Sequence, residues 1–494
     1  MWRLLFLMAP ALGFQLNREP PPPAASSRAS FDTRWLDVRL NHFDATNTDT
    51  FPMRFFFNPR EANASNIVIF VGGEWEITPG WVTGGLAYNI AEYTDASLFY
   101  TEHRYYGLTR PTNGTSVPEL RFLTIDQALA DLAQFITYVK SDAFEQGRFR
   151  NAKVMLVGCS YAGTMATWMR VQYPHLIDGS FSDSGPLHAQ EDFPEYLKVV
   201  GDAISSQGGQ SCYTTIEEAV SEVTEMLNST GGRNQVTQIF NTCELLSPAN
   251  LDIATFHWVA LIYPFAALVQ GASPGEIPEM CEQLTSGNST AVERLAAWVR
   301  AQHGTPCLET RYLELVDQYT NTSFDSEAAT MRAWMYQTCV EYGWYQTTNG
   351  GPHQPFGSGV PLEYFLQMCR DFFSPSFDAA RLSYGVRRTN LFYGGPSQIP
   401  DKVVSVAGQF DPWYPMGPNE THSRPQAPVY FVPDISHCRI IYAVNDSETD
   451  SVADVKMRVI RHMNAFAFGT PVPDSAARVV SSVVLLLGVV VSML

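Results

Sequence analysis

Short continuous apolar runs recur in the first and last parts of the chain, and each run ends in glycine or polar residues. Such runs are typical of parallel strands that are buried on both faces of a sheet. Two earlier segments alternate apolar with polar positions and are rich in aromatics, as in ordinary strands. The predicted strands are Trp35–Phe43, Phe51–Phe57, Asn66–Val71, Ala96–Tyr100, Lys153–Val157, Gly179–Gly185, Lys402–Ala407 and Val429–Val432.

Helical periodicity separates these strands. Thr124 and Gln127 form a capping box for a helix over Ala128–Ile136, and Ser451–Phe468 reads as a closing amphipathic helix. Strands that alternate with helices predict a mostly parallel sheet with flanking helices. Between residues 191 and 380 helical patterns dominate, as in Ile216–Leu227, which predicts a mostly helical cap domain inserted into an α/β core.

The remaining boundaries follow from composition. We expect a signal peptide over 1–15, because one basic residue precedes a short apolar run; a buried helix is the alternative. A proline-rich lead over 16–30 is predicted to be extended and mobile, with the folded part beginning near Phe31. The core is then expected over 31–190 and 381–470, interrupted by the cap, and a hydrophobic tail over 471–494 completes the division.

The C-terminal apolar run and the N-x-S/T sequons are features of proteins that enter the secretory pathway. The apolar run Val479–Leu494 fits a lipid-anchor signal, a tail anchor that attaches the protein to a membrane, or neither. Several N-x-S/T sequons support glycosylation of a secreted or lysosomal protein. These are Asn63, Asn113, Asn228, Asn288, Asn321, Asn419 and Asn445.

Composition and charge narrow the function classes. Apolar residues make up 45% of the 494 residues, which is enough for a sizeable core. The formal net charge of −18 argues against a nucleic-acid partner. Because no paired C-x-x-C motif occurs, we expect no metal site. No cofactor is expected either.

A serine after the third buried run is the strongest chemical signal. Gly158-Cys-Ser160-Tyr-Ala-Gly163 lies between a predicted strand and a predicted helix, where a nucleophile elbow places its serine. The usual pattern has glycine two residues after the serine. Ala162 stands there and is small enough to preserve the turn. An ordinary strand–helix turn is the alternative.

The elbow is followed by candidate partners in the order that α/β-hydrolases use. Asp411 follows one predicted strand and His437 follows the next, so the expected triad is Ser160, Asp411 and His437. The backbone N–H groups of Tyr161 and of Gly73, in a glycine-rich loop after an early strand, are candidates for the oxyanion hole.

Two cysteines provide an independent check. Cys159 precedes the candidate nucleophile and Cys438 follows the candidate base, so a disulfide between them would tie the two loops together. Separate buried thiols are the alternative. The residues alone leave fifteen pairings open for the other six cysteines.

Ordered motifs resemble the family of lysosomal Pro-X carboxypeptidase, dipeptidyl peptidase II and thymus-specific serine protease. They run from about Trp35 to Phe468 and look most similar to the thymus-specific branch. Besides the elbow, they are Leu40–Phe43, Gly72–Glu74, Thr101–Gly107, Gln127–Ala133, Tyr336–Cys339, Gln409–Trp413 and Ser436–His437. The resemblance implies an α/β-hydrolase core with a helical insertion and a serine exopeptidase activity, often directed at the bond after proline.

The resemblance also implies site residues. Ser160, Asp411 and His437 match the family's triad, and Trp413 matches an aromatic wall of the substrate pocket. Thr164 and Trp344 stand where the Pro-X branch has pocket methionines. The disulfides it implies in the cap are Cys212–Cys281, Cys243–Cys307 and Cys339–Cys369.

The sequence therefore predicts a secreted or lysosomal serine exopeptidase that forms an acyl-enzyme on short peptides. An esterase or lipase on the same core, and a catalytically silent binding protein of hydrolase shape, are the alternatives. Peptides are the expected partners and nucleic acid is not. Membrane attachment through the tail and a homodimer are left open, as is the choice between carboxypeptidase and aminopeptidase action.

Overall fold

The computed structural model describes residues 19–23, 30–60, 64–351, 353–445 and 447–472 of the chain. The predicted signal peptide, the apolar tail and Asn63 lie outside these residues. Within them, an eight-stranded sheet has the order β1-β2-β4-β3-β5-β6-β9-β10. Its strands are β1 Asp32–Arg39, β2 Thr50–Asn58, β3 Asn66–Val71, β4 Ala96–Thr101, β5 Val154–Cys159, β6 Gly179–Asp183, β9 Val403–Gly408 and β10 Val429–Val432.

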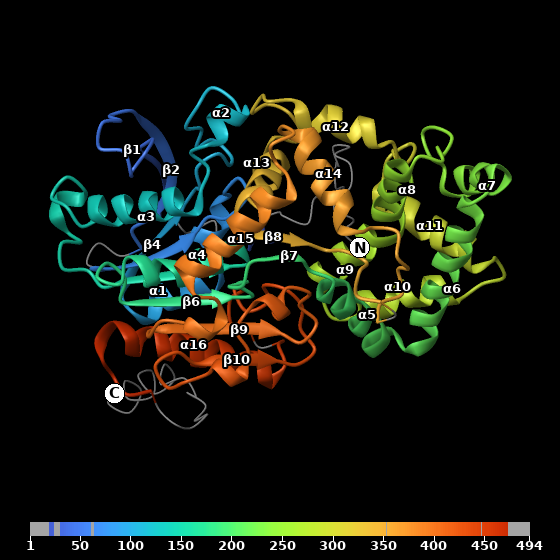
Figure 1. The fold of residues 1–494 in the computed structure, drawn as a ribbon. Helices are drawn as coiled ribbons and strands as arrows, with labels where there is room; N and C mark the ends of the chain where they lie inside the picture. Colours follow the sequence, from blue (N-terminus) through green and yellow to red (C-terminus); the bar gives the residue numbers. More distant parts are fainter. Residues whose placement is uncertain (1–18, 24–29, 61–63, 352, 446, 473–494) are drawn as a thin grey trace, which may run out of the picture.

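The pairing of the strands identifies the architecture. From β4 to β10 all neighbours are parallel, whereas β2 is antiparallel to both β1 and β4. The central strands are fully buried, in keeping with their continuous apolar runs. This strand order with one antiparallel strand near the edge is that of an α/β-hydrolase, so the predicted fold class is confirmed (Figure 1).

Helices cover both faces of the sheet. Phe466 of α16 packs over Gly179 of β6, while Gly163 of α4 packs against Ser182 of the same strand. Since odd and even positions of a strand point to opposite faces, α16 and α4 lie on opposite sides. The helices that surround the sheet are α1 Gly85–Tyr93, α2 Val117–Leu120, α3 Ile125–Val139, α4 Tyr161–Gln172, α15 Ala379–Tyr393 and α16 Asp450–Phe468.

Polar residues at the ends explain where several of these helices begin and stop. The hydroxyl of Thr124 accepts the N–H of Gln127 at the start of α3, which is one half of the predicted capping box. The other half does not form, because the Gln127 side chain bonds Asn41 and the N–H of His42 instead. Thr449 caps α16 in the same way, and Gly469 ends that helix in the left-handed conformation, which glycine adopts without steric cost.

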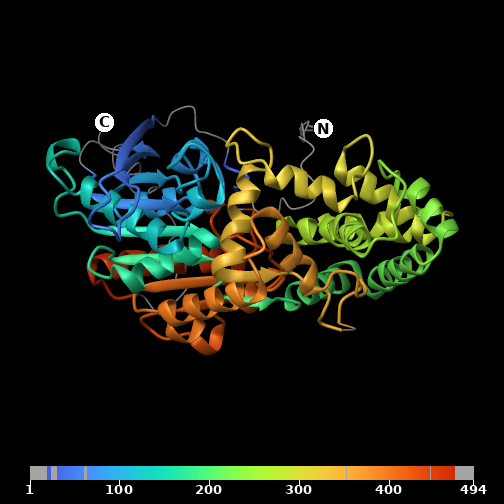
Figure 2. The same cartoon turned by 45° about the horizontal axis from the view of Figure 1, so that its top comes forward.

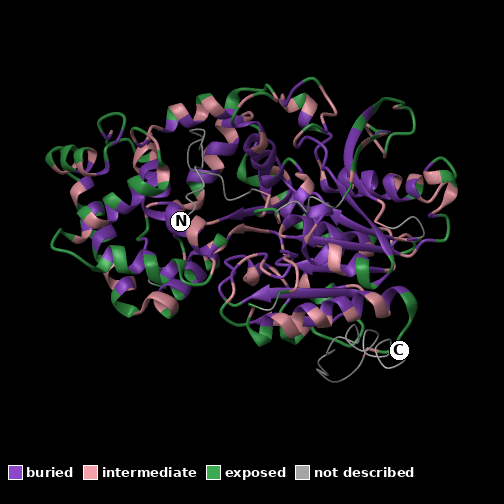
Figure 3. Cartoon of the chain, turned by 180° about the vertical axis from the view of Figure 1, so that it is seen from behind, coloured by how far each residue is buried: buried purple, intermediate pink, exposed green. Residues whose placement is uncertain are grey.

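A large helical segment separates β6 from β9 in sequence. Its helices are α5 Glu195–Gly208, α6 Gln210–Leu227, α7 Thr230–Phe240, α8 Asn250–Phe256, α9 Tyr263–Gly271, α10 Glu276–Thr285, α11 Ala291–His303, α12 Tyr312–Thr320, α13 Ala329–Gln337 and α14 Leu362–Phe372. Figures 1 and 2 agree in placing α6, α7 and α11 beyond one end of the sheet. Figure 3 shows that the exposed residues gather on the outer turns of this segment.

Shorter elements complete the description. Two π-helical turns, η3 His257–Ile262 and η4 Thr338–Tyr342, interrupt the helical segment. The 3₁₀ turns are η1 Pro79–Val82, η2 Glu145–Gly147, η5 Pro396–Gln398, η6 Tyr414–Met416 and η7 Glu420–His422. The continuous helix over Asn250–Gly271 is long and apolar enough to cross a membrane, but 72% of its most apolar window is buried inside the protein, as in a core helix.

Two strands inside or beside the helical segment were missing from the sequence prediction. Strand β7, Gln190–Asp192, pairs in parallel with β8, Gly343–Tyr345. Each strand has only three residues, too few for an alternating pattern to emerge, so the sequence pattern predicts neither of them. The pair ties the end of the helical segment to the loop that follows β6.

The structure also corrects the prediction for the proline-rich lead. The sequence predicts a mobile lead and a folded part beginning near Phe31, but residues 19–23 pack on the core. The carboxylate of Glu19 accepts the backbone N–H and the hydroxyl of Thr78 at 2.9 and 2.6 Å. The hydroxyl of Tyr100 donates to the same carboxylate at 2.8 Å. Three donors to one carboxylate anchor the lead at this point, which proline content alone could not reveal.

Candidate active site

The candidate nucleophile lies on a strained turn. Ser160 connects β5 to α4 with φ 57° and ψ −133°, a backbone conformation that is costly for any residue other than glycine. A Cβ atom at Gly158 would lie 2.1 Å from the carbonyl oxygen of Ala162, so glycine is required before the turn. At Gly163 a Cβ atom would lie 2.9 Å from the hydroxyl of Ser182. This is the geometry of a nucleophile elbow, with its second glycine displaced by one residue.

The candidate base and carboxylate are joined by a hydrogen bond. Nδ1 of His437 lies 2.7 Å from Oδ1 of Asp411, and the Asp411 side chain is fully buried. The backbone N–H of Trp413 donates to the same oxygen at 2.9 Å. Because Nδ1 donates to the carboxylate, Nε2 carries the free lone pair. That nitrogen is buried and has no hydrogen-bond partner in the part of the chain that the structure describes.

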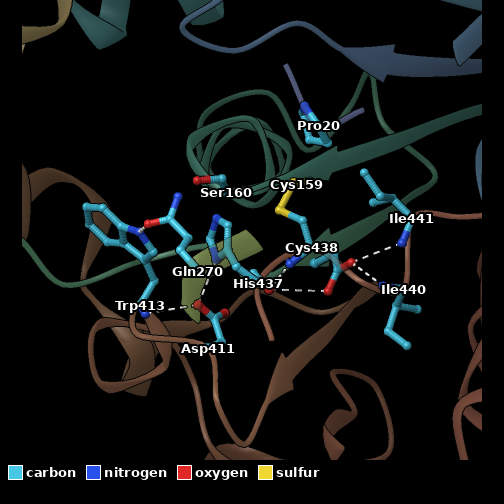
Figure 4. The surroundings of a disulfide bond; sticks show 12 residues. Pro20, Cys159, Ser160, Gln270, Asp411, Trp413, His437, Cys438, Ile440 and Ile441 are labelled. Carbon is cyan, nitrogen blue, oxygen red and sulfur yellow. Dashed lines mark hydrogen bonds and ion pairs between the residues drawn. A yellow bond between two sulfur atoms is a disulfide. The ribbon is translucent and has the colours of Figure 1, made fainter. Parts of the chain in front are cut away.

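Figure 4 shows the ring of His437 between Asp411 and Ser160. Burial alone would lower the pKa of His437, but the charge and hydrogen bond of Asp411 raise the pKa above its ordinary value. Asp183 and Glu74 raise it further through their charges. The imidazole is therefore well suited to accept a proton from the serine hydroxyl.

A disulfide holds the serine and histidine loops together. Cys159 and Cys438 are bonded, with 5.6 Å between their Cα atoms (Figure 4). The other disulfides are the pairs that the resemblance implied, Cys212–Cys281, Cys243–Cys307 and Cys339–Cys369. Four disulfides fit a protein that folds in an oxidising compartment.

The two candidate oxyanion donors lie at the ends of neighbouring strands. Tyr161 is the first residue of α4, so its N–H belongs to the positive end of the helix dipole. Gly73 follows β3, and a Cβ atom there would lie 2.7 Å from the ring of Trp75. The hydroxyl of Tyr161 is held by the side-chain amide of Gln337 at 2.9 Å and by Tyr342 at 3.2 Å. The helical segment thus contacts the residue next to the nucleophile.

Two buried carboxyl groups lie near the histidine and were not singled out from the sequence. Burial raises the pKa of Glu74 to about 7, against the lowering effect of the His437 charge, and Oε2 of Glu74 has no partner among the described residues. Burial also raises the pKa of Asp183 to about 7, although backbone N–H groups and His437 lower it in part. Glu74 belongs to the Gly72–Glu74 motif, which was an available signal, whereas Asp183 had only its position at the end of a predicted strand.

Aromatic side chains surround the histidine on one side. The rings of Trp344 and Trp413 meet edge to face at 5.7 Å, and Trp413 lies 6.4 Å from the ring of His437. Phe193, which the sequence did not single out, lies 5.7 Å from Trp413. Thr164 is fully buried and donates its hydroxyl to the carbonyl of Pro186 at 2.6 Å, so that hydroxyl is already paired.

Three of the family motifs contribute to one buried network. Arg104 donates two hydrogen bonds to Asp131 at 2.7 Å, and His42 lies 2.7 Å from the same carboxylate. Arg104 is also fully buried. A buried ion pair with all its hydrogen bonds satisfied fixes the relative position of α3 and the loops around it. This network has a structural role, while His103 of one of these motifs lies 3.3 Å from the hydroxyl of Tyr161, next to the candidate nucleophile.

No metal centre is evident: among the described residues, no group of three or more His, Cys, Asp and Glu side chains could hold an ion.

Comparisons with solved structures add little. Carboxyl esterase 2 of Tuber melanosporum aligns over 92% of both chains with 10% identity and a TM-score of 0.36. Proline iminopeptidase of Mycobacterium smegmatis aligns over 88% of this chain and 99% of its own, with 11% identity and a TM-score of 0.35. At these TM-scores neither likeness carries an argument.

The sheet order, the elbow and the histidine–carboxylate pair define the protein as an α/β-hydrolase of the serine hydrolase class. The family model "Serine carboxypeptidase S28" matches residues 38–459, and the chain belongs to that family.

Relatives agree with this assignment. Thymus-specific serine protease of Mus musculus is 29% identical over 85% of this chain and 84% of its own, and that of Homo sapiens is 28% identical over 87% and 86%. Lysosomal Pro-X carboxypeptidase of Mus musculus is 25% identical over 81% of both chains. The chain is thus nearer to the thymus-specific proteins than to the Pro-X carboxypeptidase, as the motifs predicted.

Proposed function

We propose that the protein is a serine exopeptidase that hydrolyses short peptides through an acyl-enzyme intermediate. The observation that carries the proposal is the pairing of His437 with Asp411, beside the elbow of Ser160, with Nε2 of His437 left without a partner in the described part of the chain. A neutral imidazole with a free Nε2 is what a general base requires. Membership of a serine peptidase family supports peptides as the substrate class.

The proposed mechanism follows from the positions of these groups. The hydroxyl oxygen of Ser160 attacks the scissile carbonyl while Nε2 of His437 takes its proton. Asp411 keeps the imidazole in the tautomer that accepts at Nε2 and stabilises the imidazolium that forms. The N–H groups of Tyr161 and Gly73 stabilise the oxyanion. His437 then gives its proton to the leaving amine, and water repeats the cycle to release the acyl group.

We further propose that the helical segment between residues 191 and 380 acts as a cap on the two core parts, 31–190 and 381–470. Gln337 and Tyr342 bring this segment against Tyr161, next to the nucleophile. A cap in this place would admit short peptides or chain ends. The rings of Trp344 and Trp413 favour a flat apolar residue, such as proline, before the cut.

The compartment is part of the same proposal. Four disulfides are consistent with the secretory pathway, and six of the seven sequon asparagines belong to the described residues and are exposed, as a glycan requires. We propose a glycosylated protein, secreted or lysosomal, whose tail over 471–494 attaches it to a membrane or is removed. Phospholipase release from the cell surface would identify a lipid anchor.

The test is cleavage of a mixed peptide library by the glycosylated, secreted protein, with the products identified by mass spectrometry. Ser160→Ala removes the proposed nucleophile. Ser180→Ala, which removes a buried hydroxyl of β6 that has no partner among the described residues, is the matched control. Cuts near one end of the peptides, lost in Ser160→Ala and kept in Ser180→Ala, would support the proposal. Internal cuts in folded proteins would contradict the exopeptidase assignment.

Two added assays, hydrolysis of an activated ester and labelling by a fluorophosphonate, separate the alternatives. An esterase would hydrolyse activated esters and react with a fluorophosphonate but leave the peptides intact. A silent binding protein would do neither. The same outcomes therefore separate the three functions.

A further inference from the structure

One buried carboxylate contacts both catalytic loops. Asp183 is the last residue of β6, the strand between β5, which leads to Ser160, and β9, which leads to Asp411. In the parallel register it stands beside Cys159 on one side and Val406 on the other. Its main-chain carbonyl accepts the N–H of Ser160 at 2.9 Å. The backbone of Asp183 thus supports the strained turn that carries the nucleophile.

The side chain of the same residue holds the histidine loop. Oδ2 of Asp183 accepts the N–H groups of Ile440 at 2.8 Å and Ile441 at 3.0 Å, two residues just beyond His437 (Figure 4 labels both). The neighbouring hydroxyl of Ser184 accepts the N–H of Cys438 at 2.9 Å. Three hydrogen bonds, from the N–H groups of Cys438, Ile440 and Ile441, therefore fix the backbone that follows the histidine.

We propose that Asp183 is a positioning residue, which sets the placement of His437 relative to Ser160 through these backbone contacts. The inference rests on the proposed triad. The disulfide between Cys159 and Cys438 limits how far the two loops can separate, whereas Asp183 determines how the histidine segment is oriented between them. Without this acceptor, two buried N–H groups would lose their partner and the segment would shift to find another.

The charge of Asp183 acts on the histidine as well. The titratable groups around it are His437 and Asp411 on the catalytic loops, Tyr442 on the following loop, and the buried Lys456 of α16. Glu74 faces His437 from the loop after β3. A negative charge at Asp183 favours the imidazolium, so its removal is expected to lower the pKa of His437.

The experiment measures inactivation of the full secreted protein by a fluorophosphonate over a range of reagent concentrations and pH. Asp183→Ala removes both the acceptor and the charge, whereas Asp183→Asn keeps an oxygen acceptor and removes the charge alone. Ser180→Ala, on the same strand and without a partner for its hydroxyl among the described residues, is the matched control. Saturation separates the maximal inactivation rate from the half-saturating concentration.

We expect Asp183→Ala to lower the maximal inactivation rate by about 10- to 100-fold, because a misplacement of the order of 1 Å costs that much. The half-saturating concentration should stay near the wild-type value. Asp183→Asn should recover most of the inactivation rate. In a plot of that rate against pH, its midpoint should lie roughly one pH unit below the wild-type midpoint. Ser180→Ala should match the wild type in both quantities.

The outcomes separate this inference from the proposed function. A folded wild type that does not react would overturn the proposed function, and this inference with it. If the wild type reacts, and both Asp183 variants have the same inactivation rate and the same pH midpoint as the wild type, this inference alone would be overturned. Should Asp183→Ala not be secreted, Asp183→Asn decides: an unshifted pH midpoint with the wild-type rate would refute the role of Asp183.

Discussion

Glu341 offers a test of the electrostatics of the interior that does not depend on catalysis. It lies in the π-helical turn η4, and both carboxyl oxygens accept the N–H of Ile125, at 3.1 and 3.2 Å. The side chain is buried, and this burial raises the pKa of Glu341 from 4.5 to about 8, against the lowering effect of the bond from Ile125. At neutral pH the folded protein therefore holds a proton here that the unfolded chain releases.

The sign of the effect on stability follows from this difference in bound protons. Between the ordinary pKa of 4.5 and the folded pKa of about 8 for Glu341, the folded state binds one proton more, so stability falls as the pH rises. Each pH unit costs about 1.4 kcal/mol per proton. Between about pH 6 and pH 9, the Glu341 carboxyl alone should lower the free energy of unfolding by roughly 3 kcal/mol.

The assay compares urea unfolding of the wild type and Glu341→Gln across that range, followed by tryptophan fluorescence. Glutamine keeps an acceptor for Ile125 but cannot ionise, so the variant should lose about 3 kcal/mol less stability than the wild type as the pH rises. Glu363→Gln, on an exposed position of α14, is the matched control and should follow the wild type. Parallel stability profiles for wild type and Glu341→Gln would refute the reasoning.

Three further changes have expected outcomes. Asp411→Asn should slow fluorophosphonate inactivation by up to about 10⁴-fold, since the imidazole would take the wrong tautomer; a wild-type rate would exclude the proposed role. Cys159→Ser should cost about 2–5 kcal/mol in urea unfolding and also slow inactivation. Cys243→Ser, in the helical segment, should cost stability alone, and equal slowing in both would show that the first disulfide has no special link to the site. Glu19→Ala should lower the free energy of unfolding by about 1–3 kcal/mol, because the N–H of Thr78 loses its partner; unchanged stability would show that the lead is not anchored by that residue.

Patterns that depend on burial were predicted well from the sequence. Strands β3 and β10 have the predicted bounds, Asn66–Val71 and Val429–Val432, because a buried run that stops in turn residues marks both ends of a strand. The candidate base and carboxylate were also predicted correctly as neighbours. His437 and Asp411 each follow a parallel strand, and the carboxyl ends of such strands meet at one edge of the sheet.

Features that depend on distant contacts were not predictable. Strand β8 exists because it pairs with β7, which lies far away in the sequence. Proline content suggested a mobile lead, whereas the carboxylate of Glu19 fixes it to Thr78. Asp183 looked like an ordinary strand end, since the N–H groups it accepts belong to residues more than 250 positions later in the chain. Composition and periodicity carry no information about such partners.

The order of the catalytic segments along the chain has a consequence for how the protein is made. Cys159 and Cys438 are 279 residues apart in sequence, and the strands that lead to Asp411 and His437 come after the whole helical segment. Closing so long a loop is a late step of folding, because its entropy must be lost before the contacts form. During synthesis the serine turn therefore leaves the ribosome long before its base. In the proposed triad, Ser160 therefore has no base and no orienting carboxylate until β9 and β10 have joined the sheet.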